Sequence, residues 1–314
     1  MRETVGIREV GPREALQAVA EALPTDRKIE LIRRLIACGF RSLNAVSLVS
    51  PKAMPHMADA EAVLEGIGPV PGVAISALTP NARALSRAAS LAGRGLLDEV
   101  FFVHATTSSV LTANGLPGSL DANFSRITEL SEQAKAGGLR VGVFVSAAFG
   151  CSMEGRVNPD RVMRIVEALR QLSSVDEIVI SDSTGQADPS QVARLLDELA
   201  PVIDDSPCTV HFHDSRGTGL ANAVAAIASP IINLTLDTSF GGLGGDIPFI
   251  PEAAGNVATE DLVAMLDGMG VSTGVDAAGV AAVAGAYREW SSVPLRSHIA
   301  DVGPVRWKAA PLAG

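Results

Sequence analysis

The stretch EIVISDSTGQADPSQVARLLDELAPVIDDSPCTVHFHD, residues 177–214, decides the fold. It opens with a β-branched run at Glu177–Asp182, continues with a helical period at Pro189–Leu199 and returns to a β-branched run at Cys208–His213. A strand, a helix and a second strand in close succession form the unit from which parallel sheets with right-handed crossovers are built. The stretch therefore predicts an α/β fold.

The same unit recurs about eight times along the chain, judged by the period of its apolar residues. The predicted strands are Thr4–Val10, Arg41–Leu48, Gly72–Leu78, Glu99–Val103, Arg140–Ser146, Glu177–Asp182, Cys208–His213 and Ile231–Asp237. Helices are predicted at Thr25–Ala37, Leu120–Ala136, Pro159–Leu172, Pro189–Leu199, Gly219–Ile227, Thr259–Gly268 and Asp276–Trp290. Eight such units predict a (β/α)8 TIM barrel. The alternative is an open doubly wound sheet, but no GxGxxG motif follows the first strand, as its dinucleotide-binding form would require.

No linker divides the chain, so we expect a single domain over residues 1–314. The barrel is predicted to cover about residues 4–258, and additional C-terminal helices about 259–290. Residues 291–314 show no clear period, and we expect an irregular tail there.

Composition limits the partners. The formal charge of the 314-residue chain is −10, which argues against nucleic acid because phosphate binding needs a basic face. No apolar run approaches the roughly 18 residues that span a bilayer, and the N-terminus lacks an apolar signal core. The three cysteines are scattered, as is typical of a reducing compartment. We therefore expect a cytoplasmic protein that does not bind membranes or nucleic acid.

Two histidines stand at the end of the seventh predicted strand, in His211-Phe212-His213-Asp214. Residues two apart in a strand face the same side, and barrel enzymes place their reactive groups at the carboxyl ends of the strands. His211 and His213 are therefore predicted to bind a divalent metal together. The alternative is two unrelated polar histidines.

Charged residues stand at the end of the first predicted strand and just past it, in Glu9-Val10-Gly11-Pro12-Arg13-Glu14. A carboxylate here can join the metal, and Arg13 can hold a substrate oxygen that becomes negative in the transition state. The alternative is an ordinary charged start of a helix after a proline turn.

Three further segments are candidates for functional residues at the same end of the barrel. The glycines of Gly241–Asp246 indicate either a lid or a simple flexible turn. Asn256 can supply an amide oxygen to the metal or cap the next helix. Asp182 can support a metal-bound histidine or Arg13, or it can cap its own turn.

Taken together, these segments resemble the 3-hydroxy-3-methylglutaryl-CoA lyase family of metal-dependent TIM-barrel lyases and aldolases. The resemblance runs in order from residue 4 to about 275. It rests on Val5–Gln17, Ser47–Lys52, Gly150-Cys151 with Glu154-Gly155, His211–Asp214, Gly241–Asp246 and Gly255–Asp261.

The resemblance implies a carbon–carbon lyase that cleaves a 3-hydroxy-acyl-CoA by a retro-aldol or retro-Claisen route. It implies a divalent cation, Mg²⁺ or Mn²⁺ with Zn²⁺ as an alternative, a small acyl-CoA or hydroxy-acid substrate and, by analogy, a homodimer. The implied metal ligands are Glu14, His211, His213 and Asn256. We predict Arg13, Asp182, His211 and Asp246 as catalytic residues; the resemblance implies Arg13, whereas Asp182 and Asp246 are predicted from their positions in this chain. Gln17, Asn44 and Ser47 are predicted to bind substrate.

The chain departs from the family pattern at several positions. Glu14 stands where the family has Asp, Asn44 where it has Glu, and Ala20 where a basic residue is tied to CoA binding. The lid cysteine is replaced by Asp246, which is expected to transfer the proton in its place if lid closure desolvates it. The alternatives are an aldolase or condensing enzyme for another hydroxy or oxo acid, and a non-catalytic paralogue that binds a ligand.

Overall fold

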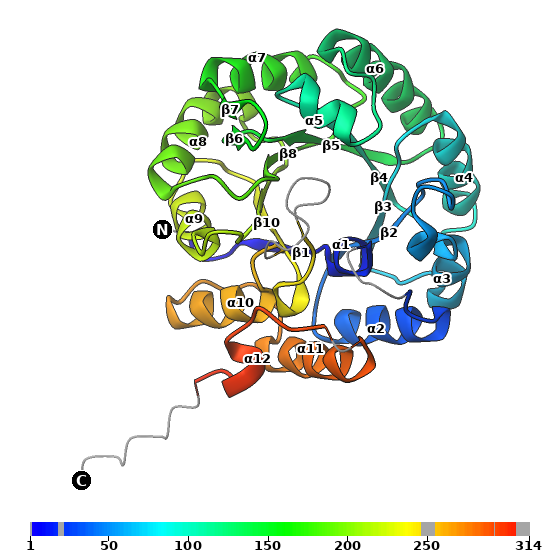
Figure 1. Ribbon diagram of the computed structural model, residues 1–314, viewed down its shortest axis with the longest axis vertical. Coiled ribbons are helices and arrows are strands. Elements are labelled where there is room, and N and C mark those ends of the chain that lie inside the picture. The colour runs from blue at the N-terminus through cyan, green and yellow to red at the C-terminus, as the bar shows by residue number, and fades with distance from the viewer. Residues whose placement is uncertain (1, 18–21, 246–254, 292, 306–314) are drawn as a thin grey trace.

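In the computed structural model, eight parallel strands of the described residues, 2–17, 22–245, 255–291 and 293–305, close into a barrel (Figure 1). These strands are β1 (Gly6–Glu9), β2 (Ser42–Ser47), β3 (Ala74–Leu78), β4 (Glu99–Ala105), β5 (Arg140–Ser146), β8 (Glu177–Asp182), β9 (Cys208–Phe212) and β10 (Leu234–Thr238). Around the barrel the order is β1-β10-β9-β8-β5-β4-β3-β2. The predicted TIM barrel is confirmed.

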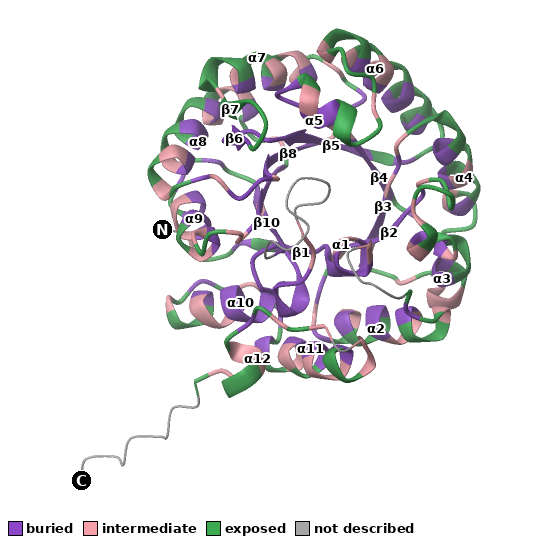
Figure 2. Ribbon diagram, viewed as in Figure 1, coloured by how far each residue is buried: buried purple, intermediate pink, exposed green. Residues whose placement is uncertain are grey.

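Helices form an outer ring around the strands (Figure 1). In chain order the helices of the barrel are α1 (Gly11–Gln17), α2 (Thr25–Ala37), α3 (Ala60–Ile67), α4 (Ala82–Ala92), α5 (Ser108–Ala113), α6 (Leu120–Ala136), α7 (Pro159–Arg170), α8 (Pro189–Ile203) and α9 (Gly219–Ile227). The short helices α1 and α5 lie inside the outer ring, nearer the strands (Figure 1). Each turns an apolar stripe inward; α4, for example, buries Ala84, Leu85, Ala88 and Leu91. Figure 2 shows the consequence, because burial is concentrated on the strands and on the inner faces of the helices.

The interior of the barrel has an apolar part and a charged part. Phe101, Phe144 and Val179 form a small cluster that is separate from the main core between strands and helices. Arg8 is also buried, with 1% of its surface exposed, and its guanidinium lies 4.3 Å from the centre of the Phe101 ring. A buried cation needs hydrogen-bonding or charged partners. One of the partners of Arg8 also contacts a residue of the functional site described below.

Most predicted elements are confirmed, and the differences have local causes. α8 continues to Ile203, although Pro201 stands in its last turn and cannot donate a backbone hydrogen bond. β10 begins at Leu234, three residues later than Ile231. A short hairpin of β6 (Gly150–Cys151) and β7 (Gly155–Arg156) was not predicted. Two-residue strands show no alternation that a sequence pattern could reveal.

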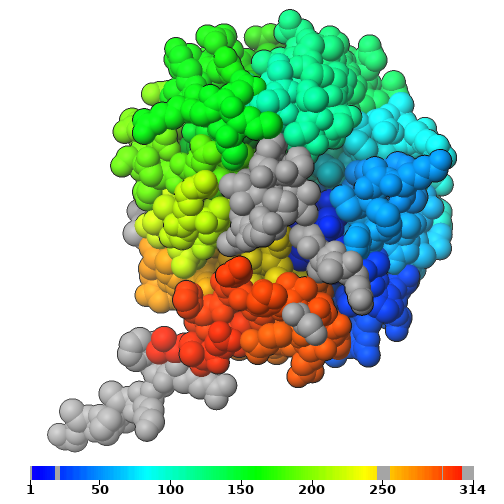
Figure 3. Space-filling model, viewed as in Figure 1, coloured from blue at the N-terminus to red at the C-terminus, as the bar shows by residue number. Residues whose placement is uncertain are grey.

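Additional helices follow the barrel at the C-terminal side: α10 (Thr259–Gly268), α11 (Ala277–Ser291) and α12 (Ile299–Val302). In Figures 1 and 3 these orange and red segments lie beside the blue N-terminal helices, and α11 packs against α2. α12 falls in the tail that was predicted to be irregular. The Asp261 carboxylate anchors it by accepting from Ser297 Oγ and from the backbone N–H groups of His298 and Ile299.

The prediction of one domain over residues 1–314 stays a prediction. Two short 3₁₀ helices complete the described elements, η1 (Pro55–Met57) and η2 (Phe240–Gly242). Among the described residues, no helix is both long and apolar enough to cross a membrane.

Candidate active site

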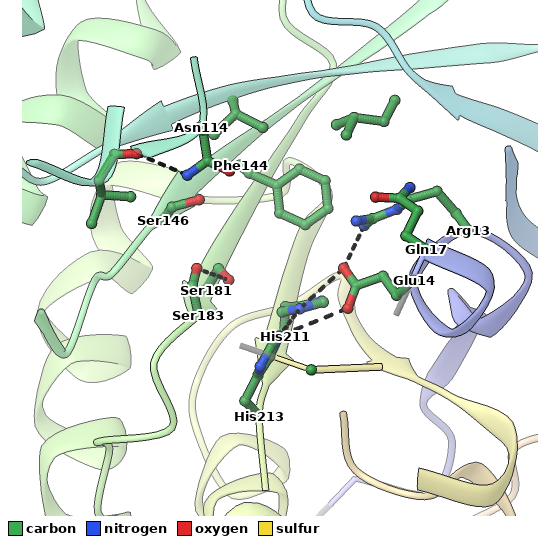
Figure 4. Close-up of a pocket in the computed structure, with 14 residues that line it drawn as sticks. Arg13, Glu14, Gln17, Asn114, Phe144, Ser146, Ser181, Ser183, His211 and His213 are labelled. Carbon is green, nitrogen blue, oxygen red and sulfur yellow. Dashed lines mark hydrogen bonds and ion pairs between the residues drawn. The ribbon is translucent and has the colours of Figure 1, made fainter. Parts of the chain in front are cut away.

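Two histidines face each other at the carboxyl end of β9. The Nε2 atoms of His211 and His213 are 3.2 Å apart, and both side chains are buried (Figure 4). His211 lies in β9, whereas His213 lies just beyond it and pairs with Asn256 in an isolated antiparallel bridge. The two rings therefore converge as their spacing predicts, although only one of them belongs to the strand.

Glu14 completes a cluster with these histidines. β1 ends at Glu9, and α1 begins at Gly11 and points Glu14 at both rings. Its Oε1 lies 3.6 Å from His211 Nε2 and its Oε2 lies 3.7 Å from His213 Nε2. Burial alone would raise the pKa of Glu14, but the charge of Arg13 and then those of the histidines lower it to about 2.

Asn256 approaches the same cluster from the segment before α10. Its Nδ2 donates to Glu14 Oε2, while its Oδ1 is buried and has no partner among the described residues. Asn256 does not cap α10, because the N-cap position is taken by Ala258. The capping alternative is therefore wrong, and a buried amide oxygen is left available to a ligand.

These four residues fit a divalent cation. One ligand atom from each of Glu14, His211 and His213 lies within 4.8 Å of the others, and the unpartnered Asn256 oxygen adjoins them. Metal ligands must be deprotonated. The low pKa of Glu14 keeps it ionised, and burial, followed by the His211 charge, lowers the pKa of His213 to about 4. A mixed nitrogen and oxygen donor set suits Mg²⁺, Mn²⁺ or Zn²⁺.

Arg13 stands beside this cluster on α1. Its Nη2 lies 2.6 Å from Glu14 Oε1, and its Nε donates to Asn44 Oδ1 over 3.2 Å. Its guanidinium carbon is 5.7 Å from the centre of the Phe144 ring. Glu14, Asn44 and the Phe144 ring thus contact the planar guanidinium from different sides, so its orientation is set before any ligand enters.

A cavity of about 150 Å³ opens over these groups. Its lining includes Arg13, Glu14, Gln17, His211 and His213, as Figure 4 shows. Further polar lining comes from residues that the sequence analysis did not single out: Asn114, Ser146, Ser181 and Ser183. Ser146 ends β5, and Ser181 and Ser183 adjoin Asp182 at the end of β8, so a position at the carboxyl end of a strand was the available signal for these three serines.

The other predicted site residues lie differently. Asn44 and Ser47 are fully buried on β2 and do not line the cavity. Asn44 is connected to the cavity only by its hydrogen bond with Arg13, as far as the described residues show. Ser47 Oγ has no partner among the described residues. The Asp182 carboxylate accepts the backbone N–H groups of Gln186 and Ala187. These contacts favour the turn-capping alternative, and a catalytic role for Asp182 stays a prediction. Asp246 lies outside the described residues.

An aspartate that the sequence analysis missed supports one of the histidines instead. Asp237 Oδ2 lies 3.0 Å from His211 Nδ1, and Asp237 Oδ1 accepts from Arg8 Nε over 2.7 Å. Burial would raise the pKa of Asp237, but the Arg8 charge and the His211 contact lower it.

Known proteins share this fold and this sequence pattern. The chain is 36% identical to the hydroxymethylglutaryl-CoA lyase of Pseudomonas mevalonii over 281 residues, which cover 90% of each protein. It is 35% identical to the mitochondrial enzyme of Arabidopsis thaliana over 87% of its own length but only 56% of that enzyme's length. A solved HMG-CoA lyase from Acinetobacter baumannii, in complex with coenzyme A and 3-methylmalate, superimposes with a TM-score of 0.89 at 32% identity and covers 98% of each chain.

The family model described as HMGL-like matches residues 4–286, which include the whole barrel and all three segments that carry Glu14, the two histidines and Asn256. The chain therefore belongs to the HMGL-like family, a family of carbon–carbon lyases.

Proposed function

We propose that this protein cleaves a carbon–carbon bond of a 3-hydroxy-acyl-CoA, 3-hydroxy-3-methylglutaryl-CoA or a related thioester, with a divalent cation held by Glu14, His211, His213 and Asn256. The observation that carries the proposal is the convergence of Glu14, His211 and His213 beside Arg13 in the lining of one cavity. Asn256 contacts Glu14 and keeps a buried, unpartnered Oδ1 among the described residues. The family relatives named as hydroxymethylglutaryl-CoA lyases support the substrate class.

The cation would polarise the substrate oxygens and lower the pKa of the 3-hydroxyl group. The residues of the chain supply the rest. When the hydroxyl proton leaves to a base, the C2–C3 bond breaks, a carbonyl forms at C3, and the bonding electrons pass to C2 and the thioester oxygen as an enolate. Arg13 lines the cavity with its guanidinium held by Asn44 and Glu14, so its N–H groups meet the negative charge that appears only as the bond breaks.

The enolate must then be protonated at C2. We assign this step to Asp246, which occupies the family's cysteine position at the end of the Gly241–Gly245 run. A carboxylic acid can donate near neutral pH only if burial raises its pKa. Closure of the lid over the substrate would provide that burial.

The acyl group is the open part of the proposal. The cavity offers a hydroxyl-rich wall at Ser146, Ser181 and Ser183 and an apolar wall at Leu78, Val103 and Phe144. Such a pairing suits a short branched hydroxy acid with a second carboxylate. The Acinetobacter relative was solved with coenzyme A and 3-methylmalate, so thioesters of substituted malates are the second candidate substrates.

We also propose a cytoplasmic location and a homodimer. Support for the location comes from the scattered, reduced cysteines and from a relative, 35% identical, that is named cytoplasmic in Mus musculus. The dimer is an analogy with other members of the fold.

The test assays purified protein with Mg²⁺ or Mn²⁺ for turnover of 3-hydroxy-3-methylglutaryl-CoA, measured as formation of acetyl-CoA and acetoacetate. Malyl-CoA and methylmalyl-CoA are assayed in parallel as the second class of candidate substrates. His211→Ala is the matched control and should lose both turnover and metal binding. Turnover of either thioester class, lost in the control, would support the proposal and name the substrate. Metal binding with no turnover of any thioester would overturn the lyase activity in favour of a ligand-binding paralogue.

A further inference from the structure

Three neighbouring strands place their inward side chains at one level of the barrel. Arg8 of β1 is in register with Asp237 of β10, and Asp237 is in register with His211 of β9. Laterally paired residues of a parallel sheet point to the same side. The three side chains are therefore adjacent because of the strand order, although Arg8 and Asp237 are 229 positions apart in the sequence.

The contacts along this row are directional. Arg8 Nε donates to Asp237 Oδ1 over 2.7 Å, and Asp237 Oδ2 faces His211 Nδ1 over 3.0 Å. The guanidinium is held from two other sides, since its Nη1 donates to Glu177 Oε1 over 2.8 Å and its plane lies over the Phe101 ring. Asp237 and Arg8 are both almost completely buried, so water does not compete for these contacts.

We propose that Arg8 and Asp237 are positioning residues that lock His211 in the tautomer with its proton on Nδ1, so that Nε2 presents a lone pair to the metal. The inference rests on the proposed metal site. An arginine can only donate, so the oxygen that faces it must accept. The second oxygen of the same carboxylate must also accept, and His211 can meet it only with an N–H at Nδ1.

The Asp237 carboxylate accepts hydrogen bonds at both of its oxygens, which an amide of the same size cannot do. An asparagine at position 237 would turn its oxygen to Arg8 and its NH₂ to the histidine. His211 Nδ1 would then have to accept, and the ring proton would move to Nε2, where it blocks the metal. Metal-bound histidines commonly depend on such partners, and losing one typically costs roughly 10–100-fold in metal affinity.

His213 provides an internal contrast. Its Nδ1 is buried and has no partner among the described residues, so no comparable contact sets its tautomer. With His211 fixed as the acceptor at Nε2, the 3.2 Å contact between the rings requires His213 Nε2 to donate in the metal-free protein. The contacts from Arg8 through Asp237 to His211 therefore determine which ring nitrogen carries the proton in His211 and, through the contact between the rings, in His213.

The experiment reads the tautomer directly. Protein with ¹⁵N-labelled histidine is studied metal-free at about pH 8, where the unperturbed imidazole is neutral, and the His211 signals are assigned with His211→Gln. The proposal expects the proton on Nδ1 in the wild type and on Nε2 in Asp237→Asn. A wild-type His211 with its proton on Nε2 would overturn the proposal without the need for any variant to fold.

Mn²⁺ affinity by titration calorimetry provides the second readout. Asp237→Asn should bind Mn²⁺ about 10–100-fold more weakly. The matched control is Glu177→Gln, which disturbs the other partner of Arg8 without touching His211 and should leave the affinity within about 3-fold. Equal affinity in the wild type and Asp237→Asn would refute the positioning role, whereas no binding by the wild type would refute the proposed metal site itself.

Discussion

Arg13 Nε donates to Asn44 Oδ1 over 3.2 Å, at the position where the family pattern has a glutamate. The Nδ2 of Asn44 is buried without a partner among the described residues. A neutral amide therefore replaces a carboxylate beside the guanidinium, and Glu14 is the only acidic residue in direct contact with Arg13 among the described ion pairs. More of the positive charge of Arg13 is then available to a substrate oxygen.

Asn44→Ala should lower kcat about 10-fold and leave Mn²⁺ affinity within about 2-fold, because a lost hydrogen bond to a charged group is worth roughly 1.5–3 kcal/mol. Steady-state kinetics and calorimetry measure the two effects. Ser76→Ala is the matched control: Ser76 is buried in the neighbouring strand, in register with Asn44, and its hydroxyl donates to Leu43 rather than to Arg13. Equal kcat values for the two variants would show that Asn44 has only a structural role.

Arg13→Lys should lower kcat about 10²–10³-fold with little change in metal affinity, because it removes oriented N–H donors whose contact with the substrate oxygen is needed only in the transition state. Lysine keeps the charge, but one ammonium cannot reproduce the planar fork that contacts Asn44 and Glu14. The exposed substitution Arg34→Lys on α2 is the control. A higher KM with an unchanged kcat would instead mean that Arg13 contributes equally to ground-state binding.

The sequence was sufficient for the barrel and for the histidine pair. Strands such as Arg140–Ser146 and Glu177–Asp182 coincide with the structure because buried parallel strands are continuous β-branched runs between turn residues. His211 and His213 were found because a spacing of two in a strand is a local property. The resemblance added Glu14 and Asn256, which local pattern alone left among several alternatives.

Asp237 was missed for the opposite reason. Its importance depends on the register of β10 against both β1 and β9, which joins residues from distant parts of the chain. Asp182 carries the same chemistry at a more conspicuous place, but its oxygens are satisfied by the N–H groups of its own turn. The register between neighbouring strands decides which of the two strand-end aspartates supports a histidine. A local sequence pattern carries no information about that register.

The role of Asp246 can be separated from that of the metal by two substitutions. Asp246→Asn should lower kcat about 10²–10⁴-fold, because an amide cannot supply the proton that general acid catalysis requires. Asp246→Cys restores the family residue, whose pKa of about 8.5 allows donation at neutral pH, and should retain substantial turnover. Both variants should bind Mn²⁺ as the wild type does. Full turnover by Asp246→Asn would exclude Asp246 as the proton donor.

Glu9 should make the stability of the fold depend on pH. It is completely buried at the end of β1; its Oε1 accepts from the backbone N–H groups of Gly11 and Phe240, and its Oε2 accepts from Thr259 Oγ1. Burial outweighs these hydrogen bonds and raises the pKa of Glu9 from 4.5 to about 8. The folded state therefore binds a proton between pH 4.5 and about 8 that the unfolded state has released.

This contribution to stability is fully present below pH 4.5 and is lost as the pH rises through about 8. Its upper limit is on the order of 5 kcal/mol, at about 1.4 kcal/mol for each pH unit by which the two pKa values differ. Glu9→Gln keeps an acceptor for the two backbone N–H groups but cannot ionise. The free energy of urea unfolding of the wild type should therefore fall relative to that of Glu9→Gln between pH 5 and 9. The exposed substitution Glu289→Gln serves as the control. Parallel curves for the wild type and Glu9→Gln over this range would show that Glu9 is already ionised in the folded protein at pH 5, with its hydrogen bonds outweighing its burial.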